Sequence, residues 1–304
     1  MDGDPTPPPA THGRFSFEWF SGLPTYRSAN LAQVEGFLSR LRVPSPWVGI
    51  DVACGVGLMS ELCAEVADRL GATLRGTFMV DRDAQALGIA RDHLASKPVA
   101  LLQGLGQSLP LPDDLGAFVV IGNGIHNFAA EAKASLFRES YRVMRHGAGL
   151  FFNSAFYAGT VMDGTDRFYT DTVRQALRIA RGLGGGEAPS NDRSAAGKPE
   201  AARPIDAPGY ARLAEEAGFT EVTAHEMVVP MDQPLWEAIA DYADYALGAL
   251  HHRFSAEVAC TAMREATRRV FEEPGFLARY PGAIEFEGRL AIPRRWLWVT
   301  AEKP

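Results

Sequence analysis

Residues 49–57 read Gly49-Ile50-Asp51-Val52-Ala53-Cys54-Gly55-Val56-Gly57, and this stretch is the strongest local signal in the sequence. A short apolar strand over 47–53 runs into a turn with two glycines, and residues 57–70 then read as a helix. Glycine lets the backbone turn sharply and approach a ligand closely, and the following helix presents free N–H groups at its N-terminus. Taken alone, this turn predicts only a nucleotide-type site, because many such sites share it.

An alternation of strands and helices extends outward from this turn. Further strands are predicted at 74–80, 99–103, 117–121, 149–153, 221–229 and 289–301. Helices are predicted at 29–42, 84–94, 130–144 and 207–217, with two more within 234–273. A stretch rich in Gly, Ala, Pro and charged residues, 182–203, is expected to be a flexible loop. Strands that alternate with helices predict a parallel sheet covered on both faces.

Composition limits the function classes. Lys and Arg number 30 against 37 Asp and Glu, a net charge of −7 with no basic run, which argues against a nucleic-acid partner. Cys54, Cys63 and Cys260 are too few for a disulfide framework or a Cys-rich zinc site, so we expect no metal and a reducing compartment. No apolar run reaches the 18–20 residues or so of a membrane span. We therefore expect a soluble, cytoplasmic protein without a membrane partner.

Two families of Gly-rich turn compete for residues 49–57. Aligned on the dinucleotide pattern G-x-G-x-x-G, the chain offers Ala53, Gly55 and Leu58, so it lacks the first and third glycines. The stretch instead resembles the first motif of class I S-adenosylmethionine-dependent methyltransferases, an acid followed by G-x-G-x-G. Asp51 matches the acid, Gly55 and Gly57 match the last two glycines, and Ala53 departs from the first.

Five later segments are similar to the same family, in the same order. Val80-Asp81-Arg82-Asp83 ends the second strand, where the family has an acid that binds both ribose hydroxyls. Asp81 matches that acid best and Asp83 second, with Arg82 beside them; alternatively, Asp83 caps the next helix.

The next segment, 103–112, resembles the family's G-D-A-x-x-L-P-F-P sequence beside adenine. Leu105 stands where the family usually has Asp, next to Gly106. The resemblance therefore implies that Gln107 or a backbone carbonyl replaces the carboxylate that would accept from the adenine amino group.

The segment 121–128 resembles the exit of the family's fourth strand, where the cofactor sulfonium meets the substrate. This implies that Asn123 contacts the cofactor and Asn127 the substrate. Residues 141–149 and 208–219 resemble two helix ends of the family. Over 45–230 the match is nearest to the small-molecule branch that includes ubiquinone and menaquinone methyltransferases.

The resemblance implies an α/β fold with a Rossmann-like, doubly wound sheet of about seven strands, mostly parallel with an antiparallel last strand. A helical insertion over 231–288 lies between the last two strands and acts, by analogy, as a lid. Residues 1–13 are expected to be a disordered tail, and 14–304 a single methyltransferase domain.

His126 is the candidate general base. It lies at the predicted carboxyl end of a strand, where parallel sheets bind ligands, and the ordinary pKa of histidine suits proton removal near neutrality. Alternatively, His126 only packs beside the cofactor. His251-His252 is a poor metal pair, because adjacent residues of a helix point about 100° apart.

Residues 233–250 are expected to form one helix. Its aromatic residues at helical spacing are typical of a core or a dimer contact, which leaves a homodimer open. The alternative is an apolar or aromatic substrate pocket. Its expected members are Tyr26, Tyr157, Tyr169, Tyr242 and Tyr245, with Phe17 and Trp19.

The sequence thus favours S-adenosyl-L-methionine as cofactor and methyl transfer to a small, apolar or aromatic metabolite of secondary metabolism. The departures at Ala53 and Leu105 keep a second function open, in which the cofactor is a scaffold for binding or for a rearrangement or cyclisation without methyl transfer. A nicotinamide oxidoreductase is disfavoured by the missing glycines. No N-P-P-[YF] segment, which would favour amide or exocyclic-amine methylation, is present.

Overall fold

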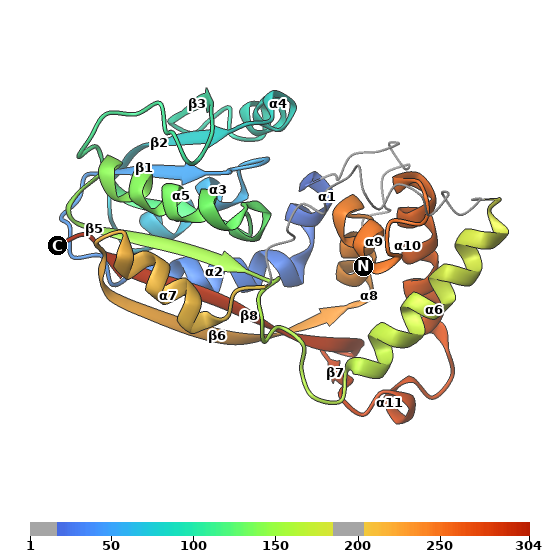
Figure 1. Ribbon diagram of the computed structural model, residues 1–304. Coiled ribbons are helices and arrows are strands. Elements are labelled where there is room, and N and C mark those ends of the chain that lie inside the picture. The colour runs from blue at the N-terminus through green and yellow to red at the C-terminus, as the bar shows by residue number, and fades with distance from the viewer. Residues whose placement is uncertain (1–16, 185–203) are drawn as a thin grey trace. The chain divides into compact units, whose positions relative to one another are not determined.

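The computed structural model describes residues 17–184 and 204–304 (Figure 1). Contacts divide the chain into two compact units. Of the described residues, unit 1 comprises 17–27, 161–184 and Val229–Arg294, and unit 2 comprises Ser28–Thr160, 204–228 and Arg295–Pro304. We describe each unit by itself.

The sheet follows the order β3-β2-β1-β4-β5-β8-β6. Its strands are β1 (Trp47–Val52), β2 (Leu74–Asp81), β3 (Val99–Gln103), β4 (Gly116–Ile121), β5 (Met144–Ser154), β6 (Thr220–Asp232) and β8 (Arg289–Glu302), and a short β7 (Ile284–Phe286) pairs with β8. Strands β1 to β5 are parallel, and β8 runs antiparallel to β5. This confirms the predicted Rossmann-like sheet with an antiparallel last strand, whereas β7 was not anticipated.

Both faces of the sheet in unit 2 are covered by helices. Phe151 and Phe152 are neighbours on β5, so their side chains point to opposite faces. Phe151 packs on Phe37 of α2 (Pro24–Leu38), with ring centroids 5.4 Å apart. Phe152 packs on Phe137 of α5 (Ala130–Val143) and Tyr210 of α7 (Ala207–Glu216) at 5.2 and 5.5 Å. Helix α2 therefore covers one face, and α5 and α7 cover the other (Figure 1).

The strand order reverses beside β1. From β1 the chain passes through α3 (Leu58–Arg69) to β2, and through α4 (Ala84–His93) to β3, before β4 returns to the other side of β1. In open α/β sheets, ligands bind in the crevice outside the carboxyl ends of the strands at such a reversal. The carboxyl ends of β1 and β4 are therefore where a site is expected.

Unit 1 is mostly helical among its described residues. It contains α1 (Phe17–Gly22), α6 (Asp166–Gly182), α8 (Gln233–Ala240), α9 (Ala243–Ala249), α10 (Ala256–Glu272) and α11 (Phe276–Arg279). Buried alanines, among them Ala176 on α6 and Ala262 on α10, pack together and let these helices approach closely. Unit 1 is larger than the helical insertion expected over 231–288, because it also includes α6, which packs against α10.

Several boundaries differ from the sequence predictions. No helix or strand was predicted between residues 157 and 205, yet α6 forms there, and 234–273 contains three helices rather than two. Helix α2 ends at Leu38 rather than at residue 42, and β5 begins at Met144, so His146 lies in a strand and does not stop a helix. The loop expected at 182–203 and the tail expected at 1–13 fall mainly outside the described residues.

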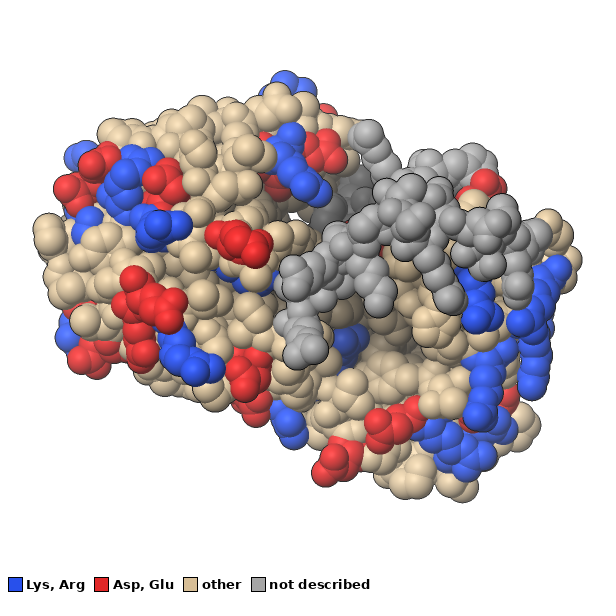
Figure 2. Space-filling model, viewed as in Figure 1, with Lys and Arg blue, Asp and Glu red and all other residues tan. Residues whose placement is uncertain are grey.

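The surface and the thiols bear on the compositional predictions. On the face of unit 2 shown in Figure 2, basic and acidic side chains are interspersed. All three cysteines are free thiols.

Among the described residues, none of the helices combines the length and the apolar character that spanning a bilayer requires.

Candidate functional site

The turn after β1 has the backbone that its glycine pattern predicts. Ala53 and Gly57 have φ of 56° and 94°, in the left-handed region that favours glycine. A Cβ on Gly57 would lie 2.8 Å from Leu94 Cδ1 and 2.9 Å from Met79 Cε, so a larger residue would have to displace these buried side chains as well as adopt a strained φ. Ala53 adopts a left-handed conformation with a side chain, which explains why the related motif has glycine at this position.

Asp51 is fully buried at the end of β1. Its Oδ2 accepts hydrogen bonds from the Ser60 backbone N–H at 3.0 Å and from the Ser60 hydroxyl at 2.7 Å. Its Oδ1 is buried without a hydrogen-bond partner among the described residues. Burial, the largest cause, raises the pKa of Asp51 to about 7. Asp51 thus ties the first turn of α3 to β1.

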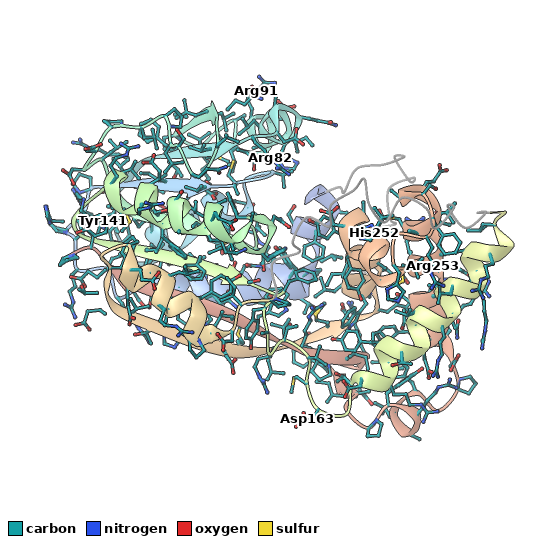
Figure 3. All side chains as sticks on the ribbon, viewed as in Figure 1. Arg82, Arg91, Tyr141, Asp163, His252 and Arg253 are labelled. Atoms are coloured by element: carbon teal, nitrogen blue, oxygen red, sulfur yellow. The ribbon has the colours of Figure 1, made fainter. Side chains whose placement is uncertain are left out.

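Asp81 and Asp83 at the end of β2 have separate functions in the structure. Asp81 is half-buried; its Oδ2 accepts from Gly55 N–H and its Oδ1 from Asp83 N–H, both at 2.9 Å. The Asp83 carboxylate accepts from Gln85 N–H at 2.8 Å and so caps α4. Of the two acids, only Asp81 is joined to the Gly-rich turn. Arg82 between them is exposed where β2 ends (Figure 3).

The segment predicted beside adenine follows β3. The Leu105 side chain is 49% exposed, although leucine is apolar. Gly106 is buried, and a Cβ there would lie 2.9 Å from Leu136 Cδ1 and from Val52 Cγ1. Gln107 is half-buried. The segment therefore presents an apolar side chain where the family has a carboxylate.

A second turn, after β4, lies against the first. Asn123 has φ of 45°, and its N–H donates to Asn153 Oδ1 at 2.7 Å. A Cβ on Gly124 would lie 3.1 Å from Ala53 Cβ, so the two turns are in near contact. The structure thus brings Asn123 to the predicted Gly-rich turn. Asn153 was missed from the sequence, because nothing local indicates that its amide reaches the neighbouring strand.

His126 follows this turn in a short 3-10 helix, Ile125–Asn127. Its Nδ1 lies 3.3 Å from the Ser154 hydroxyl, and that hydroxyl oxygen also accepts from Phe156 N–H at 3.0 Å. The His126 and Phe156 rings are 4.8 Å apart. Asn127 is exposed. Ser154, at the end of β5, was not singled out in the sequence.

The tyrosines expected in one pocket belong to different units. Tyr157, in unit 2, is buried and donates to Glu226 Oε1 at 2.6 Å; burial and this carboxylate raise its pKa. In unit 1, Tyr26 packs edge-on against Phe20 at 4.1 Å. These contacts are those of packed core residues, so a substrate function for either tyrosine stays a prediction.

The remaining members of that set lie in unit 1. Tyr169 packs on Trp236 at 5.4 Å, and burial raises its pKa. Tyr245 is on α9, and burial raises its pKa to about 12. Tyr242 precedes α9 and donates to Asp244 at 3.3 Å. Trp19 is half-buried, and the Phe17 side chain lies outside the described residues.

The predicted continuous helix over 233–250 is wrong, because Asp241 and Tyr242 separate α8 from α9. His251 and His252 follow α9 with φ of 57° and 55°, so they lie on a left-handed turn and not on a helix (Figure 3). Both are exposed.

Comparison with known proteins bears on this edge of the sheet. A family model described as "Methyltransferase domain" matches residues 50–152, from β1 into β5. The match covers about a third of the chain. It supports a methyltransferase of the class I S-adenosylmethionine-dependent superfamily, with S-adenosyl-L-methionine as cofactor. A comparison with curated proteins finds no match.

Solved structures share the fold. A methyltransferase candidate from an antibiotic biosynthesis pathway of Anabaena variabilis has 16% identity and a TM-score of 0.55, over 87% of this chain and 95% of that one. One from Bacillus halodurans has 15% identity and a TM-score of 0.51, over 91% and 99%. A phosphoethanolamine N-methyltransferase from Haemonchus contortus, in complex with phosphomonomethylethanolamine and S-adenosylhomocysteine, has 13% identity and a TM-score of 0.50, over 91% of this chain and 52% of that one.

The residues at the edge fit the cofactor of this superfamily. Each oxygen of Asp81 accepts one backbone N–H. A carboxylate has about four acceptor positions, so about two remain for a pair of hydroxyl donors such as those of ribose. The exposed Leu105 side chain offers an apolar surface of the kind on which a planar base packs.

Proposed function

We propose that this protein transfers a methyl group from S-adenosyl-L-methionine to a small, apolar or aromatic metabolite, in a biosynthetic pathway of secondary metabolism. The observation that carries the proposal is the bond between Asp81 and Gly55 N–H, which joins the strand-end acid to the Gly-rich turn. The net charge of −7, and the interspersed charges on the face of unit 2 seen in Figure 2, favour a small molecule over nucleic acid.

The order of the strands gives the expected order of contacts along the cofactor. Leu105, Gly106 and Gln107 follow β3 and would take the adenine, and Asp81 ends β2 and would take the ribose. The turn over 53–57 follows β1 and Asn123 follows β4, and these would take the sulfonium and the amino-acid end beyond it. Asp51 would support the turn over 53–57 indirectly, because its hydrogen bond to Ser60 N–H fixes the start of α3.

When bound, S-adenosyl-L-methionine supplies a methyl group on a sulfonium, which needs no further activation. The protein then has to hold the acceptor atom in line with that methyl group, and positioning of this kind can contribute about 7–11 kcal/mol in favourable intramolecular cases. A base is needed only where the acceptor atom carries a proton that must leave.

We propose His126 as that base. The Ser154 hydroxyl oxygen has two lone pairs, so it can accept from both Phe156 N–H and His126 Nδ1–H. In that arrangement Nε2 of the neutral imidazole carries the lone pair that takes the proton.

Replacement of His126 by Gln is expected to lower kcat by about 100-fold or more for an acceptor whose nucleophile carries a proton. Glutamine keeps a polar side chain of similar size but takes no proton near neutrality. The measurement is release of S-adenosylhomocysteine by both proteins across pH 6–9. The Kd for S-adenosylhomocysteine should stay within about twofold, and an unchanged kcat would remove His126 from catalysis.

The proposed function is tested by ligand-induced stabilisation. A ligand that binds the native state raises Tm by mass action, so S-adenosylmethionine and S-adenosylhomocysteine should raise it and NAD should not. A rise with NAD alone would overturn the proposal.

The second function retained from the sequence, a scaffold use of the cofactor, would give the same rise in Tm. It differs in that no S-adenosylhomocysteine forms with any member of a panel of phenols, amines and carbon acids. Mass-spectrometric analysis of the same incubations for isomerised products separates the two functions.

A further inference from the structure

Four carboxamide side chains meet at the carboxyl ends of β4 and β5. Asn30 and Gln33 come from α2, Asn123 follows β4, and Asn153 lies near the end of β5. Asn30, Gln33 and Asn153 are 0%, 1% and 0% exposed. All four belong to unit 2. Buried amides of this kind are retained where their hydrogen bonds fix a structure, because an apolar core has no use for them.

Asn153 is the centre of this group. Its Nδ2 donates to Gln33 Oε1 at 2.6 Å and to Asn30 Oδ1 at 2.8 Å, and its Oδ1 accepts from Asn123 N–H at 2.7 Å. Both hydrogens of the Asn153 amide are therefore donated to side chains of α2, and its oxygen accepts from the turn after β4. The two acceptors on α2 fix the orientation of the Asn153 amide, since a flipped amide would set oxygen against oxygen.

The same bonds fix Asn123. Its side-chain oxygen accepts from Ala155 N–H at 2.9 Å, and its Nδ2 donates to Asn30 Oδ1 at 3.4 Å. These bonds, with that to Asn153, hold Asn123 at φ 45°, a conformation that non-glycine residues seldom adopt. The turn they hold then reaches Ala53, through the 3.1 Å approach at Gly124.

We infer that Gln33 is a positioning residue that acts through Asn153 and Asn123 to set the turn facing the amino-acid end of the cofactor. The inference rests on the proposed function. Among the described residues, Gln33 makes no hydrogen bond to either turn, and it acts as an acceptor only, because its Nε2 is buried without a hydrogen bond.

The strand order gives this inference its specificity. The residues proposed for adenine and ribose follow β3 and β2, on one side of β1, while Asn123 follows β4 on the other side. A change at Gln33 should therefore weaken binding of the amino-acid half of the ligand and leave the adenosine half in place.

The test compares two ligands by isothermal titration calorimetry at pH 7 with the full chain. S-adenosylhomocysteine has both halves, and 5′-methylthioadenosine lacks the amino-acid half. The variant Gln33→Met removes the acceptor at similar volume and leaves an Asn153 N–H without a partner. It is expected to raise the Kd for S-adenosylhomocysteine about 10-fold and to change that for 5′-methylthioadenosine by less than about twofold.

Two companion variants keep the test independent of folding defects. Gln33→Glu keeps an acceptor at Oε1. Because the position is buried, this variant is compared with the wild type at pH 5, where a buried carboxyl group holds its proton, and there it should restore most of the affinity for S-adenosylhomocysteine. Asn123→Gly removes the side-chain bonds while glycine tolerates the left-handed backbone, and it should show the same split between the ligands. The matched control is Gln175→Met on α6, which loses a bond of 2.7 Å to Glu273 and should bind both ligands as the wild type does.

Equal weakening of both ligands, or no weakening of either, would overturn the inference while the wild type still binds both. A wild-type chain that binds neither ligand would overturn the proposed function itself, and the inference with it.

Discussion

Replacement of Asp81 by Ala is expected to raise the Kd for S-adenosylhomocysteine by about 100-fold. A hydrogen bond to a charged group contributes about 1.5–3 kcal/mol, and the proposed contact has two of them to the ribose hydroxyls. The variant also leaves Gly55 N–H without its acceptor, so the Gly-rich turn loses a constraint. Isothermal titration calorimetry of both proteins measures the change.

Asp83 provides the control for this variant. It lies two residues away and its carboxylate caps α4, so Asp83→Ala should lower the free energy of unfolding by about 1 kcal/mol. Its affinity for S-adenosylhomocysteine should stay within about threefold of the wild type. The reverse result, with binding lost in Asp83→Ala and kept in Asp81→Ala, would assign the ribose to the other acid.

The second large effect is a pH dependence of stability that comes from Asp51. Burial raises the pKa of Asp51 to about 7, against 3.8 ordinarily. Between these values the native protein holds a proton that the unfolded chain has released, so the free energy of unfolding falls as the pH rises. From pH 5 to pH 8 this group alone should lower the free energy of unfolding by about 3 kcal/mol.

Asp51→Asn isolates this contribution, because asparagine is neutral throughout and its oxygen can still accept from Ser60. Urea unfolding of both proteins in the absence of ligand, at pH 5, 6, 7 and 8, gives the difference between their free energies of unfolding. That difference should move in favour of Asp51→Asn by about 3 kcal/mol as the pH rises. A difference that stays constant over this range would show that Asp51 does not titrate there.

Much of the sheet could be predicted from the sequence for a local reason. Each of β1 to β4 is a short apolar run bounded by turn residues, and the period of the pattern changes between strand and helix. The lysine- and arginine-free run Gly116–Ile121, fully buried, is an example. The glycine positions of the motif also predicted a left-handed backbone. Gly57 has a positive φ, and so does Ala53, which stands where the motif has its first glycine.

Helix α6 shows where local reasoning stops. Its apolar side packs against α10, which lies about ninety residues later, so its partner is not visible nearby in the sequence. The break between α8 and α9 was missed for a related reason. Tyr242 continues the helical spacing of aromatic residues, yet Asp241 already ends α8.

In the site, motif residues were predicted and supporting residues were not. Asp51, Asp81 and Asn123 stand beside strand ends and glycines, so their positions follow from the topology. Ser154 and Gln33 act on residues 28 and 120 positions away, and no spacing rule connects them. The pairing of such residues depends on the register between β4 and β5 and on the placement of α2, which only the folded chain provides.

A crystal structure of the protein with S-adenosylhomocysteine tests the central claim most directly. We expect the ligand along the carboxyl ends of β3, β2, β1 and β4, with both ribose hydroxyls on the Asp81 carboxylate and the adenine on the Leu105 side chain. The amino-acid end should lie at the turn that contains Asn123. A ligand bound elsewhere, or one whose ribose does not reach Asp81, would contradict the account.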